Sequence, residues 1–153
     1  MTVKSFKEEI KTSLKDDKKL LFLNILYTSA WLDQIYNPIF KSNGLTNSQY
    51  NILRILKGSY PEPLSVGEIK DRIMFKQTDI TRMIDRLVEK ELVSRKLCEN
   101  NRRKMDVLIT SSGIKLLEKV NPEIENAEKE YLTDKISEKE AKEVGKILDI
   151  IRS

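Results

Sequence analysis

The sequence predicts a mainly α-helical protein that carries one short β-hairpin. Three observations support this fold class: helix-start signals recur along the chain, one segment has the apolar spacing of an amphipathic helix, and two short apolar runs flank a basic loop. With 153 residues, the chain has the length of one ordinary domain, and two independent domains are not expected.

The helix starts are marked by capping boxes, in which Ser or Thr is followed three residues later by Glu or Gln. The two side chains bond two backbone N–H groups that a helix start leaves unpaired. The pattern occurs at Thr46–Gln49, Ser65–Glu68 and Ser137–Glu140, each before apolar residues at helical spacing. Asn43-Gly44 is a predicted helix end, and Tyr60-Pro61-Glu62-Pro63 separates the first two of these helices.

The segment from Gln77 to Lys90 is predicted to be an amphipathic helix. Its apolar residues fall at positions i, i+3, i+4, i+7 and i+8: Ile80, Met83, Ile84, Leu87 and Val88. Two short strands are predicted at 92–97 and 105–109, joined by the basic loop 99–104. Helix, helix and basic hairpin in this order predict a winged helix-turn-helix, with a three-helix core and a two-stranded β-wing.

Both ends of the chain are predicted to be helical and to pair two copies of the protein. The N-terminal apolar residues Phe6, Ile10 and Leu14 repeat every four residues, and 20–40 is unusually apolar. The last helix is expected to turn one apolar face inward: Val144, Ile147, Leu148 and Ile151. A small winged domain cannot cover all this surface, so we expect a homodimer; the alternative is packing on the chain's own domain.

We therefore expect one integrated domain with three parts. Residues 1–44 form N-terminal dimerisation helices, 45–113 form the winged lobe, and 114–153 form C-terminal dimerisation helices.

Composition narrows the possible functions. The chain has no histidine and one cysteine, which excludes the usual zinc sites, Ser-His-Asp catalysis and an internal disulfide framework. An enzyme is disfavoured, with only carboxylate or lysine chemistry left open, and no cofactor is expected. No apolar run is long enough to span a membrane and no signal peptide is recognisable, so we expect a cytoplasmic protein with a net charge of +4.

Three motifs in sequence order resemble the MarR family of bacterial winged-helix repressors. Leu45-Thr46-Asn47-Ser48-Gln49-Tyr50 is similar to the family's L-T-x-x-Q-Y/F, and residues 80–93 resemble its recognition helix, V-T-R-L-V-D-R-L-E-x-K-G-L-V. Asn101-Arg102-Arg103, followed by Ile109-Thr110-Ser111-Ser112-Gly113, is similar to the wing motif D-x-R and its L-T-x-x-G exit. The resemblance extends over about residues 18–153.

Three departures from the family pattern affect local structure. Asn101 stands where Asp usually braces the wing arginine, so only a neutral hydrogen bond is available there. Glu91 replaces the glycine that commonly ends the recognition helix, where a left-handed backbone would carry a steric cost. Lys76 occupies the usual capping position, so Thr78 or Asp79 is expected to compensate. The extra segment 1–17 is expected to be helical.

The resemblance implies a homodimer that binds a pseudo-palindromic DNA operator and represses transcription until a small aromatic ligand releases it. The alternative is a winged-helix module that binds protein and reads no DNA. An α-helix fits the major groove, where Gln and Arg contact base edges and Thr contacts thymine or phosphate. The expected recognition residues are Gln77, Thr78, Thr81, Arg82 and Arg86, the last with a possible structural alternative as a partner of Asp85.

The wing is expected to contact DNA through its basic residues. Arg103 is assigned to an adjacent minor groove, and the phosphate contacts are assigned to Arg95, Lys96, Arg102 and Lys104. Asp79 and Asp85 are assigned to capping and ion pairing because they would repel phosphate. Cys98 is assigned to a plain strand position, with oxidant sensing as the alternative.

Four aromatic residues fall where the family binds aromatic effectors, with a core role as the alternative: Tyr27, Trp31, Tyr36 and Tyr50.

Overall fold

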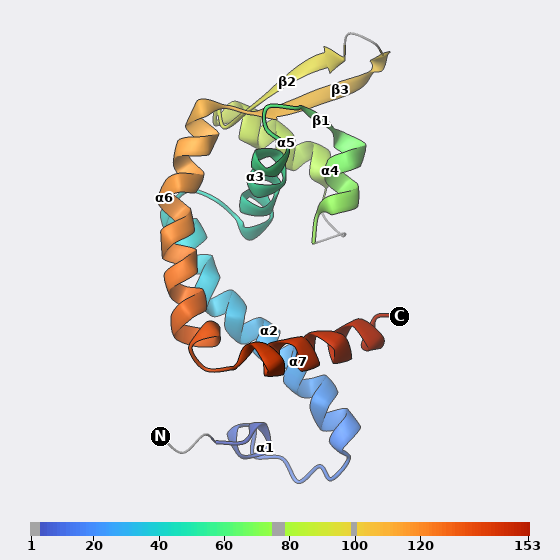
Figure 1. The fold of residues 1–153 in the computed structure, drawn as a ribbon, viewed down its shortest axis with the longest axis vertical. Coiled ribbons are helices and arrows are strands. Elements are labelled where there is room, and N and C mark those ends of the chain that lie inside the picture. The colour runs from blue at the N-terminus through green and yellow to red at the C-terminus, as the bar shows by residue number, and fades with distance from the viewer. Residues whose placement is uncertain (1–3, 75–78, 99–100) are drawn as a thin grey trace.

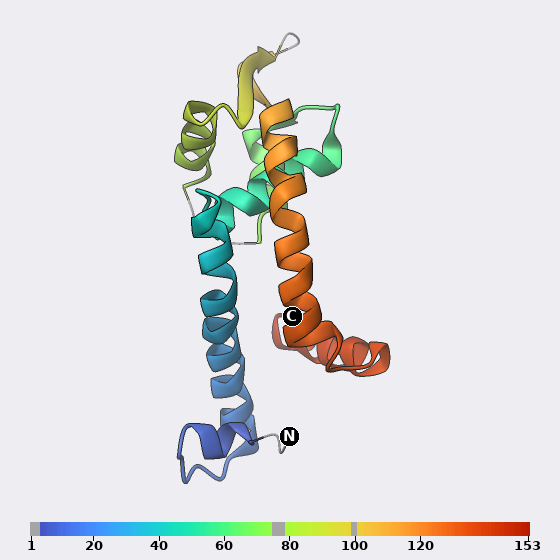
Figure 2. The same ribbon diagram turned by 90° about the vertical axis from the view of Figure 1, so that its left-hand side faces the viewer.

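The computed structural model describes residues 4–74, 79–98 and 101–153. A winged lobe occupies one end of an elongated molecule, and two long helices run from it side by side, α2 (Asp17–Ser42) and α6 (Ser111–Glu128) (Figures 1 and 2). The mainly helical fold class predicted from the sequence is confirmed.

The N-terminal segment contains much less helix than predicted. Helix α1 (Phe6–Glu9) is a single turn, and the backbone at Lys11 has a positive φ of 51°. A residue with a left-handed backbone conformation interrupts a right-handed helix, so Ile10 and Leu14 do not continue the turn that Phe6 begins. The prediction of a helix over 1–17 is therefore wrong for most of this segment.

Helix α2 begins at an N-cap, where the Asp16 carboxylate accepts hydrogen bonds from the N–H groups of Lys18 and Lys19. It ends in a Schellman motif at Gly44, whose φ is +68°. The Leu45 N–H donates to the Phe40 carbonyl at 2.8 Å, and the Gly44 N–H donates to Lys41 at 3.0 Å. The predicted stop at Asn43-Gly44 is confirmed.

The winged lobe contains the helices α3 (Asn47–Ser59), α4 (Val66–Arg72) and α5 (Ile80–Glu89). The capping boxes predicted at Thr46 and Ser65 are both present. The core of this lobe includes fully buried side chains from each helix, among them Ile52, Leu53, Leu56, Ile69, Ile84 and Leu87. Burial of these side chains against one another fixes the relative positions of the three helices.

A three-stranded antiparallel sheet completes the lobe, in the order β1-β3-β2. Strand β1 is Leu64–Ser65, β2 is Val93–Cys98 and β3 is Asn101–Ile109, with Val93 opposite Ile109 and Lys96 opposite Asp106. The two wing strands were predicted, but β3 begins four residues earlier than expected. The basic residues at 102–104 therefore belong to a strand and not to a loop.

Beyond α6, the five-residue π-helical segment η1 (Lys129–Thr133) leads to α7 (Glu138–Ile151), which runs at a steep angle to α6 (Figures 1 and 2). The capping box predicted at Ser137 is present. The apolar face of α7 that was expected to point inward is not buried within one chain, because Val144, Ile147 and Ile151 are each about half exposed. Within residues 4–74, 79–98 and 101–153, no element of a single copy buries this face.

Candidate nucleic-acid interface and internal cavity

Helix α5 separates its buried and exposed faces cleanly. Ile80, Ile84 and Leu87 are buried in the lobe, whereas Thr81 and Arg82 are exposed at the helix N-terminus. This arrangement leaves the polar face of α5 accessible, as recognition in a groove requires. Arg86 is exposed one turn further along.

Helix α5 has its N-cap later in the sequence than the family pattern places it. The N-cap is Asp79, whose carboxylate accepts a hydrogen bond from the Arg82 N–H at 3.1 Å. The capping role assigned to Asp79 is confirmed, and the cap lies three residues after Lys76. The predicted recognition residues Gln77 and Thr78 lie outside the described residues.

The end of α5 repeats the Schellman motif of α2 without its glycine. Glu91 has a φ of 57°, its N–H donates to Val88 at 2.8 Å, and the Leu92 N–H donates to Leu87 at 3.0 Å. The left-handed conformation expected at Glu91 is therefore present. It turns the chain directly from α5 into β2.

An ion pair links α5 to the wing. The Arg95 guanidinium on β2 lies 2.6 Å from the Asp85 carboxylate, with 27% of the Arg95 side chain exposed. The ion-pairing role assigned to Asp85 is confirmed, and its partner is Arg95, whereas Arg86 was the partner considered from the sequence. This contact links the hairpin to α5, and the phosphate contact expected of Arg95 stays a prediction.

The wing extends away from the helices at one end of the molecule (Figure 1). The backbone of β3 carries positions 102–104, and Cys98 pairs with Asn101 next to the hairpin turn. The side chains of Cys98, Arg102, Arg103 and Lys104 lie outside the described residues, so their assigned roles remain predictions. Lys96 is exposed on β2.

A cavity of about 380 Å³ lies between the winged lobe and the long helices. Residues from α2, α3 and α6 line it, together with Met74 after α4: Ser29, Leu32, Asp33, Tyr36, Phe40, Asn47, Tyr50, Asn51, Arg54, Met74, Ile124 and Glu128. Of the four aromatic residues predicted for a ligand site, Tyr36 and Tyr50 line this cavity. Tyr27 packs on Phe6 at 5.4 Å and Trp31 packs on Tyr131 at 5.7 Å, outside the lining.

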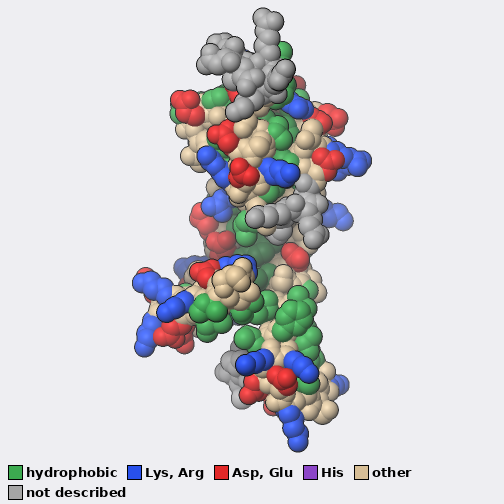
Figure 3. Space-filling view, turned by 90° about the vertical axis from the view of Figure 1, so that its right-hand side faces the viewer, with side chains coloured by type: hydrophobic (Ala, Val, Ile, Leu, Met, Phe, Trp, Pro, Cys, Tyr) green, Lys and Arg blue, Asp and Glu red, His purple; other side chains and the backbone are tan. Residues whose placement is uncertain are grey.

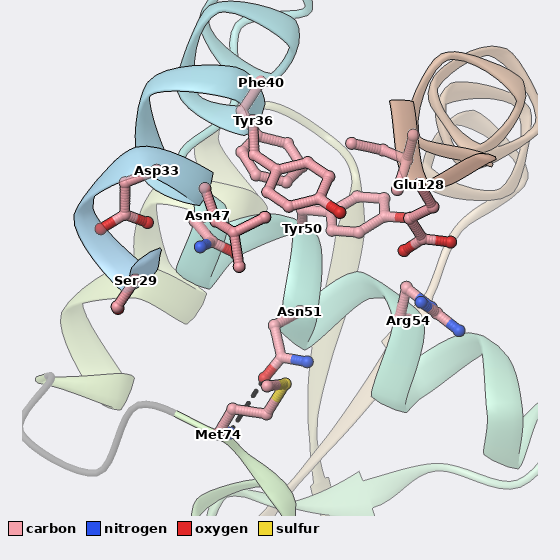
Figure 4. A pocket seen from close by; sticks show the side chains of 12 residues that line it. Ser29, Asp33, Tyr36, Phe40, Asn47, Tyr50, Asn51, Arg54, Met74 and Glu128 are labelled. Atoms are coloured by element: carbon pink, nitrogen blue, oxygen red, sulfur yellow. Dashed lines mark hydrogen bonds between the residues drawn. The ribbon is translucent and has the colours of Figure 1, made fainter. Parts of the chain in front are cut away.

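Aromatic rings form one wall of this cavity (Figure 4). The ring centroids of Phe40 and Tyr50 are 4.9 Å apart, and those of Tyr36 and Phe40 are 6.3 Å apart. The Tyr50 hydroxyl donates to the Asn121 side chain at 2.9 Å. Burial, with the nearby Glu128 carboxylate, raises the pKa of both Tyr36 and Tyr50, although Arg54 partly opposes this for Tyr50. Both phenols therefore stay neutral at physiological pH.

The cavity also reaches Met74, just after α4. The Met74 N–H donates to the Asn51 side-chain oxygen at 3.1 Å, which ties this residue to α3 (Figure 4). Sequence reasoning missed Asp33, Asn51 and Arg54, because separate elements bring them together. The spacing of Asp33, Tyr36 and Phe40 on one helical face was the available signal.

Within residues 4–74, 79–98 and 101–153, no helix is long and apolar enough to cross a membrane. No group of three or more His, Cys, Asp or Glu side chains in the same ranges is arranged to hold a metal ion.

The helix-turn-helix, the β-wing and the long flanking helices define a winged-helix protein. The MarR family model matches residues 45–105. The transcriptional regulator MhqR of Bacillus subtilis is 30% identical over 125 residues, which cover 80% of this chain and 84% of that protein. The chain belongs to the MarR family, and it is a winged-helix transcriptional regulator.

Two solved structures share the fold at low sequence identity. Sco3205 of Streptomyces coelicolor, a MarR family regulator solved in complex with DNA, has a TM-score of 0.83, 18% identity and coverage of 92% of this chain and 89% of its own. The organohalide-sensing regulator RdhR, solved with bound 2,4-dichlorophenol, has a TM-score of 0.78, 17% identity and coverage of 92% and 81%.

Proposed function

We propose that this protein binds a pseudo-palindromic DNA operator as a homodimer and represses transcription until a small ligand releases it. The observation that carries the proposal is the accessible polar face of α5. The opposite face of this helix is buried in the lobe, and Asp79 caps its N-terminus, so the helix is fixed in place. The DNA complex of Sco3205 supports DNA as the partner. Because such a regulator acts on the chromosome, we place the protein in the cytoplasm.

The roles of individual residues follow from their positions. Arg82 and Thr81, at the N-terminal end of α5, are placed to meet base edges in the major groove, with Gln77 and Thr78 preceding them. Arg86 lies further along the same helix. In the wing, Arg103 is assigned to the minor groove, and Lys96, Arg102 and Lys104 are assigned to phosphates. Arg95 acts through its contact with Asp85, by holding the wing in place.

The dimer is proposed from exposed apolar side chains at the end of the molecule opposite the wing. Figure 3 shows hydrophobic side chains gathered at this end of the molecule. The exposed large apolar residues of α2 and α7 include Leu21, Phe22, Leu26, Val144, Ile147, Ile150 and Ile151. Exposed apolar patches of this kind indicate an interface. The ends 1–44 and 114–153 would thus pair two copies, while 45–113 binds DNA.

The dimer can be tested by light scattering at micromolar concentration, where we expect a mass of about twice the 17.8 kDa chain. Replacing Ile147 on the exposed α7 face by Asp should shift the mass toward the monomer, whereas Lys142→Asp, a surface charge change on the same helix, is the control. A monomeric wild-type protein would contradict the proposed dimer.

DNA reading can be tested by selecting DNA fragments with the purified protein and measuring anisotropy on the selected operator and a scrambled duplex. Arg82→Ala should lose about 1–3 kcal/mol per half-site on the operator and less on scrambled DNA. Arg103→Ala should weaken both duplexes more evenly, because a minor groove offers shape and potential more than a base code. Arg152→Ala, at the far end of α7, is the control.

Unchanged operator binding in both Arg82→Ala and Arg103→Ala would refute this reading of DNA. A failure of wild-type protein to select any DNA would favour the protein-interaction module instead.

A further inference from the structure

The charges that line the cavity are divided unequally between its two sides. Figure 4 shows Ser29 and Asp33 of α2 on one side, Arg54 and Glu128 on the other, and the rings of Tyr36 and Tyr50 between them. On the side of α3 and α6, a guanidinium and a carboxylate offset one another. The α2 side has a carboxylate alone.

Asp33 has no compensating cation within the part of the chain that the structure describes. No Lys or Arg among the residues described there lies within ion-pair distance of its carboxylate, and none of those residues forms a hydrogen bond with it. Among the described residues that line the cavity are one arginine and two carboxylates, which together carry a net charge of −1. A smaller neighbouring cavity, which shares Tyr50, Arg54 and Glu128, adds the Glu125 carboxylate. The described side chains that line the two cavities therefore carry a net negative charge.

The aromatic wall next to Asp33 has the chemistry that organic cations prefer. Tyr36 follows Asp33 by one helical turn on α2, and Phe40 and Tyr50 continue the wall. The face of a neutral aromatic ring attracts an ammonium group, and it also stacks on an aromatic ligand. The raised pKa of Tyr36 and Tyr50 keeps these rings in the neutral state.

We propose that this cavity binds a protonated aromatic amine, with the ammonium group at Asp33 and the aromatic ring against Tyr36 and Tyr50. This inference rests on the proposed function and deepens it by naming the chemical class of the effector. An aromatic carboxylate is disfavoured at the same position, because its negative charge would face Asp33. The cavity volume of about 380 Å³ is sufficient for a one-ring ligand.

Isothermal titration calorimetry on the full-length protein without DNA tests the proposal with three probes of similar shape. Tyramine carries a cation, 4-propylphenol is neutral, and 4-hydroxyphenylacetate carries an anion. At low ionic strength we expect tyramine to bind about tenfold more tightly than 4-hydroxyphenylacetate, with 4-propylphenol between them. Equal affinities, the reverse order, or no binding of tyramine would overturn the proposal.

Asp33→Asn removes the charge and keeps the shape of the side chain. It should weaken tyramine binding about tenfold and leave 4-propylphenol unchanged. Glu118→Gln, which removes an exposed carboxylate of α6 outside the cavity lining, should change neither. An equal effect of Asp33→Asn on the amine and the phenol would refute a charge-specific role.

The result is separable from the proposed function. Operator binding by the ligand-free protein is measured in a different experiment, so tyramine binding without DNA binding would refute the regulator alone. DNA binding without amine selectivity would refute the ligand class alone.

Discussion

The replacement of Glu91 by glycine should stabilise the folded protein. The backbone of Glu91 has a left-handed conformation, with a φ of 57°. This conformation costs a residue with a side chain roughly 1–2 kcal/mol. Glycine removes that cost but loses about 0.5–1 kcal/mol through the greater freedom of the unfolded chain. The net gain is therefore about 0.5–1 kcal/mol in the free energy of unfolding.

The same molecule supplies a reciprocal test at the end of α2. Gly44 occupies the equivalent position of the same hydrogen-bonded motif, with a φ of +68° and open space around the position of a Cβ. Gly44→Ala should therefore destabilise the protein by about 0.5–1 kcal/mol, because the backbone strain exceeds the gain from a less free unfolded chain. The two substitutions have opposite signs because one motif contains glycine and the other does not.

Urea denaturation followed by circular dichroism measures both effects, at equal protein concentration because dimerisation would otherwise change the apparent stability. Glu89→Gly, at an exposed helical position of α5, is the matched control and should destabilise by about 1 kcal/mol. If Glu91→Gly destabilised the protein as much as Glu89→Gly does, the strain argument would be wrong.

Three further predictions concern packing, pH and the wing. Gly113→Ala should strongly destabilise the fold, seen as a lower melting temperature, because the added Cβ would lie 2.3 Å from the Leu92 carbonyl oxygen. Burial raises the pKa of Tyr36 on folding, so the neutral phenol contributes fully to the free energy of unfolding below the unfolded pKa near 10. This contribution is lost as the pH rises through the folded pKa. Tyr36→Phe should therefore flatten the alkaline loss of stability measured in urea titrations. Asp85→Asn should increase amide hydrogen exchange in β2, because Arg95 loses its charged partner, and unchanged exchange would contradict the bracing role.

The sequence predicted the elements whose causes are local. Thr46, Ser65 and Ser137 begin helices because each capping box is completed within four residues. The buried face of α5 follows from the spacing of its own apolar residues, and the left-handed turn at Glu91 follows from the family pattern of glycine there. Local bonds of this kind are readable without a structure.

Local spacing was misleading at both ends of the chain. Phe6, Ile10 and Leu14 have helical spacing, yet only one turn forms before Lys11 takes a positive φ. The spacing of α7 correctly places Val144, Ile147 and Ile151 on one side, but half-exposed side chains show that one chain does not cover it. Periodicity identifies an apolar face, whereas its partner depends on what the rest of the molecule, or a second copy, brings against it.

Only the tertiary structure decided the composition of the cavity and the partner of Asp85. Tyr36 and Tyr50 share a wall because α2 and α3 pack together, and the direction of α2 places Tyr27 and Trp31 beyond it. Sequence alone determined the three helix starts at Thr46, Ser65 and Ser137 and the polar face of α5, because those properties depend on neighbours along the chain. Contacts between distant segments, such as Asp85 with Arg95, depend on how packing orients whole elements, and no local pattern specifies that orientation.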